Sequence, residues 1–320
     1  MSKLWTPKQT FDVPAPRNAK DRALLCGFNE RACEEYWASE AASRNHATFF
    51  VAGQTKERED TVRLWDIFRQ VTGMDPDVTP QPDGDCVAAG ARDTVECLQA
   101  LEIFKGDREE FREIHPTFHY ATGRVLVGKN QLRGSAGSIG GWQATAIKKY
   151  GVLDASLPGI PNYNKATSQA WGDDKKVGGV SFRDFMDAAA DRVVRETARV
   201  KPIEEVFDSL SNKYPLTIAA SFGYTMKPNR DGYHRASGSW SHQMSLWGYS
   251  ISGNWVAIKN QWGRAAHGKL IDFETEEPWP PGFLRVPISD FENHLRRAEC
   301  IAYSNFDGFP EQLYDYSKLG

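Results

Sequence analysis

The sequence changes its hydrophobic pattern about two thirds of the way along the 320-residue chain. Before residue 210, apolar residues recur mostly at helical spacing, and after residue 215 runs with strand character dominate. These runs are 215–222, 242–251, 254–260 and 282–287. Gly253–Asn254 predicts a tight turn between the second and third runs. Helices followed by antiparallel strands predict an α+β fold and not a doubly wound sheet.

Helices are expected at several places in the first two thirds of the chain. We expect them over 29–43, from about 55 to 72, from 86 to 104, over 142–150, over 181–200 and over 203–210. Residues 1–27 show little periodicity and are predicted to form an extended arm. The run DPDVTPQPDGD at 75–85 contains too many Pro and Asp residues for regular structure.

Composition narrows the class of protein. The formal net charge of −3 predicts neither a nucleic-acid partner nor a membrane-surface partner. No apolar run has the length of a membrane span, and the N-terminus lacks the apolar core of a secretory signal. The five cysteines are odd in number, and no two form a CxxC pair, so neither a disulfide framework nor a zinc site is expected. A reducing, cytoplasmic location is the expectation.

One cysteine stands where a helix begins. Cys86 follows the Asp83–Gly84–Asp85 run and opens an apolar-periodic segment. The positive end of a helix dipole stabilises a thiolate, so this position favours a nucleophile. Cys97 lies about three turns further along and is expected to be a buried small apolar residue. Asp83 and Asp85 oppose ionisation of the thiol unless they face solvent.

A nucleophilic cysteine needs a base, and the base needs a residue that orients it. His242 opens one predicted strand, and Asn260 follows the next one. A tight turn between the two strands would bring these residues close together. A histidine beside a strand and an asparagine at a strand end more often have structural roles, so both interpretations remain open from the residues alone.

Five segments resemble papain-like cysteine peptidases. They are GDCVAAGARDTVE, GSIGGWQATAIKKYGV, PLTIAAS, SHQMSLWGYSISGNWVAIKNQWG and GFLRVPISDFENH. They occur in the family's order and span residues 81–295. The resemblance implies a helical left half that carries the nucleophile helix and an antiparallel β right half. It also implies a peptide or protein substrate and no metal or organic cofactor.

The resemblance also assigns roles to residues. It implies Cys86 as nucleophile, His242 as general base and acid, and Asn260 as the residue that orients His242. Trp262 would shield the Asn–His hydrogen bond from water, and Gln81 would supply the oxyanion-hole side chain. The glycines of the GSIGG loop would line the substrate cleft; they are Gly140 and Gly141.

Some positions depart from the family pattern. Gln81 precedes the cysteine by five residues, where the family has six, and Val87 replaces a common Trp. Asp83 and Ser138 stand where the family has a pair of cysteines, which agrees with a reducing compartment. The residues between Gly263 and Gly282 form an insertion that would shape the cleft.

The expected organisation is one papain-like domain with extensions. We predict an N-terminal arm with helices of unknown role over 1–74, a papain-like domain over 75–310 and a tail over 311–320. The arm is a candidate contact for partner proteins. A chain that starts at Met1 without a signal resembles the unprocessed bacterial or phage-type members of the family.

The predicted function is a thiol hydrolase that cleaves a peptide or isopeptide bond through a Cys86 acyl-enzyme. Two alternatives remain open. The papain-like fold could serve as a structural component of a larger assembly such as a phage particle, which would place it in a virion. It could instead be a cell-wall peptide hydrolase. His115 and His119 are four residues apart, but Pro116 interrupts the helix, so they are expected to be surface histidines and not metal ligands.

Overall fold

The computed structural model describes residues 16, 18–48, 58–106 and 110–306. The predicted tail at 311–320 and most of the predicted arm before residue 18 lie outside these ranges. The helices are α1 (Ala19–Leu25), α2 (Glu30–Trp37), α3 (Glu40–Asn45), α4 (Leu64–Thr72), α5 (Cys86–Phe104), α6 (Pro116–Ala121), the π-helix η1 (Thr122–Val127), α7 (Gly140–Tyr150), α8 (Lys165–Gly172), the 3₁₀-helix η2 (Phe182–Phe185), α9 (Met186–Ala189), α10 (Ile203–Ser211) and α11 (Ile288–Leu295).

The strands form one mixed sheet. They are β1 (Ala47–Thr48), β2 (Thr61–Arg63), β3 (Val194–Val200), β4 (Leu216–Ala220), β5 (His242–Ser250), β6 (Trp255–Lys259), β7 (Phe283–Pro287) and β8 (Glu299–Phe306). Their order is β1-β3-β8-β4-β5-β6-β7, and β2 pairs with β5. All these pairs are antiparallel except β1 with β3. The predicted α+β fold is therefore confirmed.

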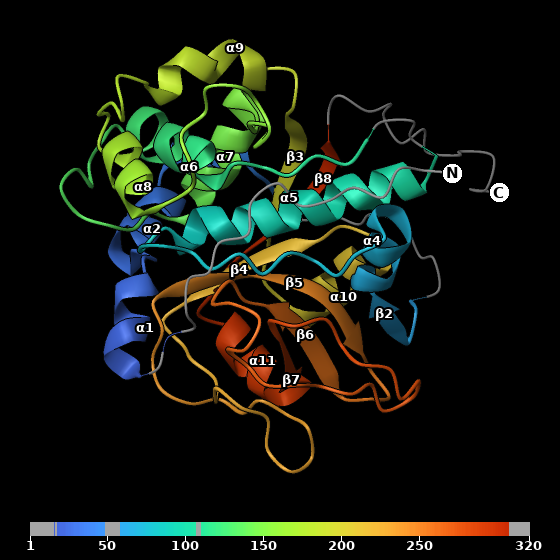
Figure 1. Cartoon of the computed structure of the whole chain (residues 1–320). Coiled ribbons are helices and arrows are strands. Elements are labelled where there is room, and N and C mark those ends of the chain that lie inside the picture. The colour runs from blue at the N-terminus through green and yellow to red at the C-terminus, as the bar shows by residue number, and fades with distance from the viewer. Residues whose placement is uncertain (1–15, 17, 49–57, 107–109, 307–320) are drawn as a thin grey trace.

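Helix α5 lies between the two halves of the molecule. Figure 1 shows it between the helices α6 to α9 on one side and the strands β4 to β7 on the other. Every residue from Cys86 to Glu102 is buried, because both halves pack on this one helix. The sheet packs one apolar cluster against α4 and α5, and a second cluster joins the start of α5 to α2 and α7.

Charged side chains on α5 are buried as pairs. Arg92 Nη2 lies 2.8 Å from Asp93 Oδ1, and Lys259 on β6 donates to Asp93 Oδ2. Gln261 Nε2 donates to the same Asp93 oxygen at 2.9 Å. Buried charges persist when they are paired and hydrogen-bonded in this way. This cluster joins the sheet half of the molecule to helix α5.

The predicted helix over 181–200 is wrong. Only η2 and α9 are helical there, and Val194–Val200 form strand β3. β3 pairs with β8 on one side and β1 on the other, and its buried residues are three apart, which is why the run also suits a helix: they are Val194, Thr197 and Val200. Partners this far away in the sequence override local helical propensity.

The N-terminal segment also differs from its prediction. The expected extended arm contains α1, whose first turn is capped by Asn18 Oδ1 accepting from the Asp21 amide at 2.9 Å. The helix expected over 29–43 is broken at Ser39 into α2 and α3, and the helix expected from about residue 55 begins at Leu64. The short strands β1 and β2 join this segment to the sheet.

The expectation that His115 and His119 lie at the surface is wrong. Both side chains are buried, and each places its Nε2 on a backbone carbonyl: His119 on Ala88 at 2.8 Å and His115 on Pro161 at 2.9 Å. Burial lowers the pKa of both to about 4, so both are neutral. Among the described residues no group of three acidic, histidine or cysteine side chains could hold a metal ion. No described helix is long and apolar enough to cross a membrane.

Candidate active site

Cys86 is the first residue of α5 and is fully buried. Burial, and after it the nearby Cys26 thiol, raise the pKa of the Cys86 thiol to about 12. The Gly27 amide, which donates to the sulfur at 3.3 Å, and the backbone of Gln243 oppose this rise. In this state the candidate nucleophile is a neutral thiol whose sulfur accepts a hydrogen bond from the Gly27 amide.

His242 and Asn260 lie at adjacent ends of β5 and β6. The antiparallel register of these strands pairs Ser245 with Lys259, which brings the residues at the two ends together. His242 Nε2 lies 2.7 Å from Asn260 Oδ1. Because the asparagine oxygen can only accept, Nε2 carries the proton and Nδ1 is left as the acceptor. Nδ1 has no hydrogen-bond partner among the described residues.

The surroundings of His242 keep it neutral. Burial lowers the pKa of its imidazole to about 4. The Trp262 ring packs on the imidazole with ring centres 4.7 Å apart, and both side chains are buried. The next residue, Gln243, lowers the pKa of the Cys86 thiol through its backbone and donates its Nε2 to Val87 O at 2.7 Å, so the start of β5 lies against the start of α5. The structure thus brings Cys86, His242, Asn260 and Trp262 into one site.

A second histidine holds Asn260, which sequence analysis did not anticipate. Asn260 Nδ2 lies 2.8 Å from His267 Nε2, and Asn260 Oδ1 also accepts from the Gln261 amide at 2.8 Å. Burial keeps the pKa of His267 well below its usual value, so His267 is neutral and can accept this bond. These bonds fix the amide with its oxygen toward His242. His267 lies in the insertion after Gly263, where no local pattern marked it.

Gln81 is buried next to Asp83–Asp85, the run that precedes Cys86. Its Nε2 donates to the carbonyl oxygens of Asp83, at 2.8 Å, and Leu25, at 2.5 Å. Its backbone amide donates to Gln261 O at 3.0 Å, which joins it to the segment that carries Asn260. The side-chain amide is therefore a donor that reaches a carbonyl of another chain segment beside the thiol.

The two acids before Cys86 do not face solvent. Asp85 is fully buried, and its Oδ2 accepts from Ser168 Oγ at 2.7 Å. Burial raises the pKa of Asp85 to about 7. Asp83 is also buried and lies 3.4 Å from Lys165 Nζ. Their opposition to a thiolate at Cys86 is lessened where Asp85 is protonated and Asp83 is paired.

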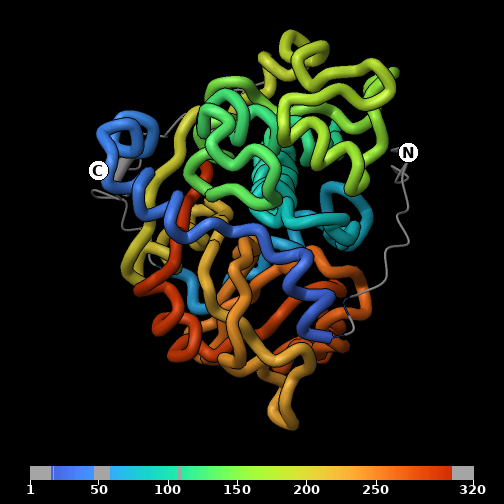
Figure 2. Tube along the Cα trace, turned by 90° about the vertical axis from the view of Figure 1, so that its left-hand side faces the viewer, coloured from blue at the N-terminus to red at the C-terminus, as the bar shows by residue number. Residues whose placement is uncertain are grey.

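A segment of the N-terminal region covers the thiol. We call Leu25–Asn29 the strap. Figure 2 shows this part of the chain, in blue, crossing between the helical half and the sheet half. Gly27 N donates to Cys86 Sγ, and Phe28 N donates to Ser241 O at 2.8 Å. On the other side Ser138 N donates to Gly27 O at 2.7 Å, and Asn29 N donates to Ser138 O at 2.9 Å.

Glycine is required at position 27, where the strap passes over Gly84. A Cβ added at Gly27 would lie 1.7 Å from the carbonyl oxygen of Gly84. No side chain fits at that distance, so the strap and the loop must separate if Gly27 is replaced.

The predicted cleft glycines have other partners. The amides of Gly140 and Gly141, at the start of α7, donate to Glu299 Oε2 at 2.7 Å and Oε1 at 2.8 Å. Trp37 Nε1 also donates to Glu299 Oε1 at 2.8 Å, which anchors α2 beside the strap. The loop residue that pairs with the strap is Ser138, two positions before Gly140.

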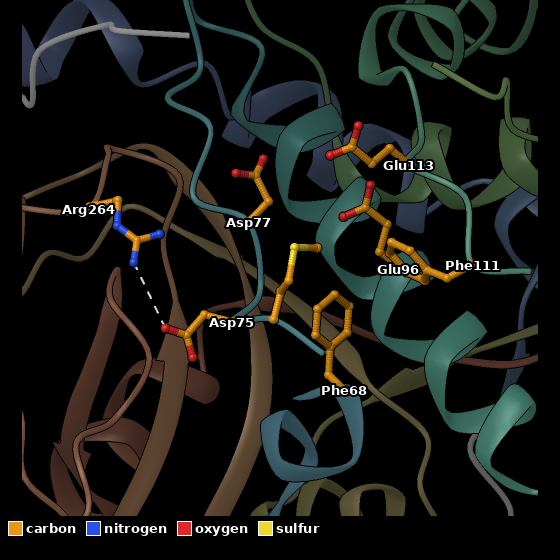
Figure 3. Close-up of a pocket in the computed structure, with 8 residues that line it drawn as sticks. Phe68, Asp75, Asp77, Glu96, Phe111, Glu113 and Arg264 are labelled. Atoms are coloured by element: carbon orange, nitrogen blue, oxygen red, sulfur yellow. Dashed lines mark ion pairs between the residues drawn. The ribbon is translucent and has the colours of Figure 1, made fainter. Parts of the chain in front are cut away.

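A separate hollow lies along the middle of α5. It has a volume of about 330 Å³, and Figure 3 shows its carboxylates and the ion pair between Arg264 and Asp75. Glu96 is ten residues after Cys86, about 15 Å along the helix, so this hollow is distinct from the thiol site. It is lined by Phe68, Met74, Asp75, Asp77, Glu96, Phe111, Glu113 and Arg264.

Comparison with known proteins identifies the structural class of the fold. A scan against protein-family models and a search of curated proteins found no match. Among solved structures, the chain is similar to xylellain, a cysteine protease from Xylella fastidiosa, with a TM-score of 0.59 and 13% identity over 88% of this chain and 97% of that one.

Two proforms are also similar. Procathepsin B S9 from Trypanosoma congolense has a TM-score of 0.55 at 12% identity, over 90% of this chain and 88% of that one. Digestive procathepsin L 3 of Tenebrio molitor larval midgut has a TM-score of 0.52 at 14% identity, over 85% and 79%. The chain therefore has the fold of the papain-like cysteine proteases.

Proposed function

We propose that this chain is a thiol peptidase that its own strap holds in a latent state. The observation that carries the proposal is the contact of Gly27 N with Cys86 Sγ, because it places an extended polypeptide across the thiol. Backbone groups of Ser138 and Ser241 hold that polypeptide from both sides. A cleft that binds peptide backbone beside a thiol suits cleavage of a peptide or isopeptide bond.

The reaction would use the residues of this site in sequence. His242 Nδ1 accepts the Cys86 proton, and the thiolate attacks the substrate carbonyl carbon. Gln81 Nε2 and the Cys86 amide stabilise the oxyanion. His242 then gives the proton to the leaving amine, which departs and leaves a thioester. Water attacks the thioester with His242 as base, which releases the acid and restores the thiol.

Asn260 would act through His242. Its hydrogen bond to Nε2 keeps the proton on that nitrogen and Nδ1 free to accept. Trp262 covers this bond, so water does not compete for it. Neither residue needs to touch the substrate for this role.

The strap occupies the groups that the reaction needs. Leu25 O accepts a hydrogen bond from Gln81 Nε2, and Gly27 N donates one to the Cys86 sulfur. The strap also shields Cys86 from solvent. Its release would hydrate the thiol and the imidazole, which lowers the pKa of Cys86 and raises that of His242 toward their usual values. Both shifts favour the thiolate–imidazolium pair.

The covered thiol also suits an alternative role. A papain-like fold that never opens could serve as an interaction component of a larger assembly, because fold alone does not fix function. In that case Cys86 stays buried at 0% exposure in the working state as well.

Labelling with a thiol-reactive epoxide separates the two roles. Gly27→Val cannot keep the strap seated over Gly84, so its Cys86 should react at least about tenfold faster than that of the parent chain, a population shift of about 1.4 kcal/mol. Leu24→Ala, at an exposed position before the strap, is the control and should label like the parent. Cys86→Ala should abolish the labelling. Equal, slow labelling of the Gly27→Val and parent chains contradicts the peptidase proposal and favours the interaction role.

A further inference from the structure

The strap carries a thiol next to its contact with the candidate nucleophile. Gly27 N lies 3.3 Å from Cys86 Sγ, and that nitrogen is bonded to the carbonyl carbon of Cys26. Covalent geometry therefore puts the Cys26 Cα within about 6 Å of the Cys86 sulfur. The electrostatic effect of Cys26 on the Cys86 thiol reflects the same closeness.

This Cα-to-sulfur distance leaves a disulfide bond within reach of a local adjustment of the strap. Bonded cysteines have Cα atoms about 4.4–6.8 Å apart, and each sulfur lies about 2.8 Å from its own Cα. Rotation of the Cys26 side chain toward α5, with a small shift of the strap, brings the two sulfurs into bonding range. The strap is already fixed on both sides of Cys26 by the bonds of Leu25 O to Gln81 and of Gly27 O to Ser138.

Exposure singles out Cys26 as the thiol that an oxidant meets first. It is partly exposed, whereas the other four cysteines are buried. Cys33 lies on α2 beside Glu299, and its pKa is raised by burial and by that carboxylate. Cys97 on α5 and Cys300 on β8 belong to the apolar core cluster of the sheet. Cys86 is closed to solvent by the strap itself, so its accessible neighbour is Cys26.

We propose that Cys26 and Cys86 form a redox latch, a disulfide that locks the strap over the candidate nucleophile under oxidising conditions. A low-molecular-weight disulfide such as oxidised glutathione is the oxidant. The Cys26 thiolate attacks one glutathione sulfur and releases the first glutathione thiol. The Cys86 thiolate then attacks the Cys26 sulfur and releases the second. Two protein thiols become one disulfide, and one oxidised glutathione becomes two thiols.

With the latch formed, two things must happen before Cys86 becomes accessible. The disulfide must be reduced, and the strap must then leave the site. A thiol reductant would return both cysteines to thiols and restore the non-covalent strap. The regulatory meaning of the latch rests on the proposed function, since it matters only if Cys86 acts as a nucleophile. Its formation does not, and can be measured separately.

Peptide mapping of the full chain tests whether the latch forms. Trypsin places each of the five cysteines on a different peptide: 23–31, 32–44, 70–92, 93–105 and 298–318. After exposure to oxidised glutathione, mass spectrometry without reductant should find peptide 23–31 linked to peptide 70–92. Dithiothreitol should release both. Cys26→Ser should lose the linked species, and the matched variant Cys33→Ser, changed in the next helix of the same segment, should keep it.

The outcomes that overturn the latch are specific. Glutathione on Cys26 with Cys86 still a thiol would show that the sulfurs do not meet. A linked species that persists in Cys26→Ser would show that another pair is involved. The linked peptide is sought in the parent chain itself. Its absence there overturns the latch even if one variant folds poorly.

Epoxide labelling then separates the latch from the proposed function. Oxidised parent chain should show no labelling of Cys86, reductant should restore it, and Cys26→Ser should label equally before and after oxidation. If the linked peptide forms but Cys86 never reacts in any reduced variant, the latch stands and the peptidase proposal fails. If Cys86 labels in reduced chain and no linked peptide forms, the latch fails alone.

Discussion

The two sides of the candidate cleft are prepared for chemistry to different degrees. On the sheet side, Asn260 is held between His242 and His267, and the imidazole has one nitrogen protonated and the other free to accept. On the helix side, the Cys86 sulfur and the Gln81 donor are both occupied by the strap. One side is preorganised, and the other is blocked by the chain itself.

This difference indicates where control of the site resides. Side chains on paired strands keep their geometry whether or not the strap is present, since the strand register places them. The groups on the α5 side change partners when the strap leaves. Variants on the sheet side should therefore change how well the opened site works, and variants of the strap should change how often it opens.

The largest expected effect concerns the buried ion pair between Lys259 on the sheet side and Asp93 on α5. Lys259→Ala leaves the Asp93 carboxylate buried with less compensation, because Lys259 is one of its two cationic partners. Removing one partner of a buried pair costs about 3–5 kcal/mol of unfolding free energy. Denaturant unfolding measures this loss.

An exposed ion pair provides the control for the buried pair Lys259–Asp93. Arg31–Glu35 on α2 has largely exposed side chains, and Arg31→Ala should cost no more than about 1 kcal/mol. Equal small losses for Lys259→Ala and Arg31→Ala would mean that the two sides are not joined through Asp93.

The next effect concerns the oxyanion donor. In the Gly27→Val background, where the strap no longer competes, Gln81→Ala should slow peptide cleavage by about 10²–10³-fold. Gln169→Ala, exposed on α8, is the matched control and should leave the rate unchanged. If both variants give the same rate, Gln81 does not serve as the donor despite its bond to Leu25 O.

The strap should respond to pH, because it shields two titrating groups. His242 has a pKa of about 4 when buried against 6.5 normally, so its protonated form favours the open state. Docking is therefore stabilised above pH 6.5 and weakened as the pH falls toward 4. The Cys86 thiol has a pKa of about 12 when buried against 9.0 normally, so docking also weakens above pH 9.

The ratio of Cys86 labelling rates in Gly27→Val and parent chains measures this pH dependence, since the intrinsic chemistry cancels. The ratio should be largest between about pH 6.5 and 9 and fall toward one near pH 4. A ratio that rises on acidification would contradict this linkage.

The smallest expected effect tests the support behind Asn260. His267→Ala removes one hydrogen bond and should lower the rate of the opened site roughly tenfold, about 1.4 kcal/mol. His267→Gln can still accept from Asn260 Nδ2 and should recover most of that loss. A merely structural role would leave the pH profile in place, whereas a freed Asn260 amide should shift the apparent pKa of His242.

The sequence was most informative where local pattern and nearby pairing agree. Cys86 was expected at the start of a helix, and α5 begins there. His242 and Asn260 were expected at the ends of neighbouring strands, and they are hydrogen-bonded. The Gly253–Asn254 turn makes this possible, because two strands joined by a tight turn bring their far ends together.

Features that depend on distant partners were not predicted. β3 has a sequence that also suits a helix, and only its pairing with β8 decides between them. The strap contains no local motif for crossing a cleft, since its role depends on Ser138 and Ser241, more than a hundred residues away. His267 lies in an insertion without periodicity, so nothing in its neighbours indicated that it would contact Asn260.

The most direct test of a strap-blocked thiol peptidase is peptide cleavage by the opened chain. Gly27→Val and Gly27→Val/Cys86→Ala would be incubated with a mixed peptide library, and new termini counted by mass spectrometry. The account predicts cleavage by the first variant, none by the second, and slow cleavage by the parent chain. Absence of cleavage by Gly27→Val, in a preparation of which a separate aliquot labels completely at Cys86 with the epoxide, would contradict it.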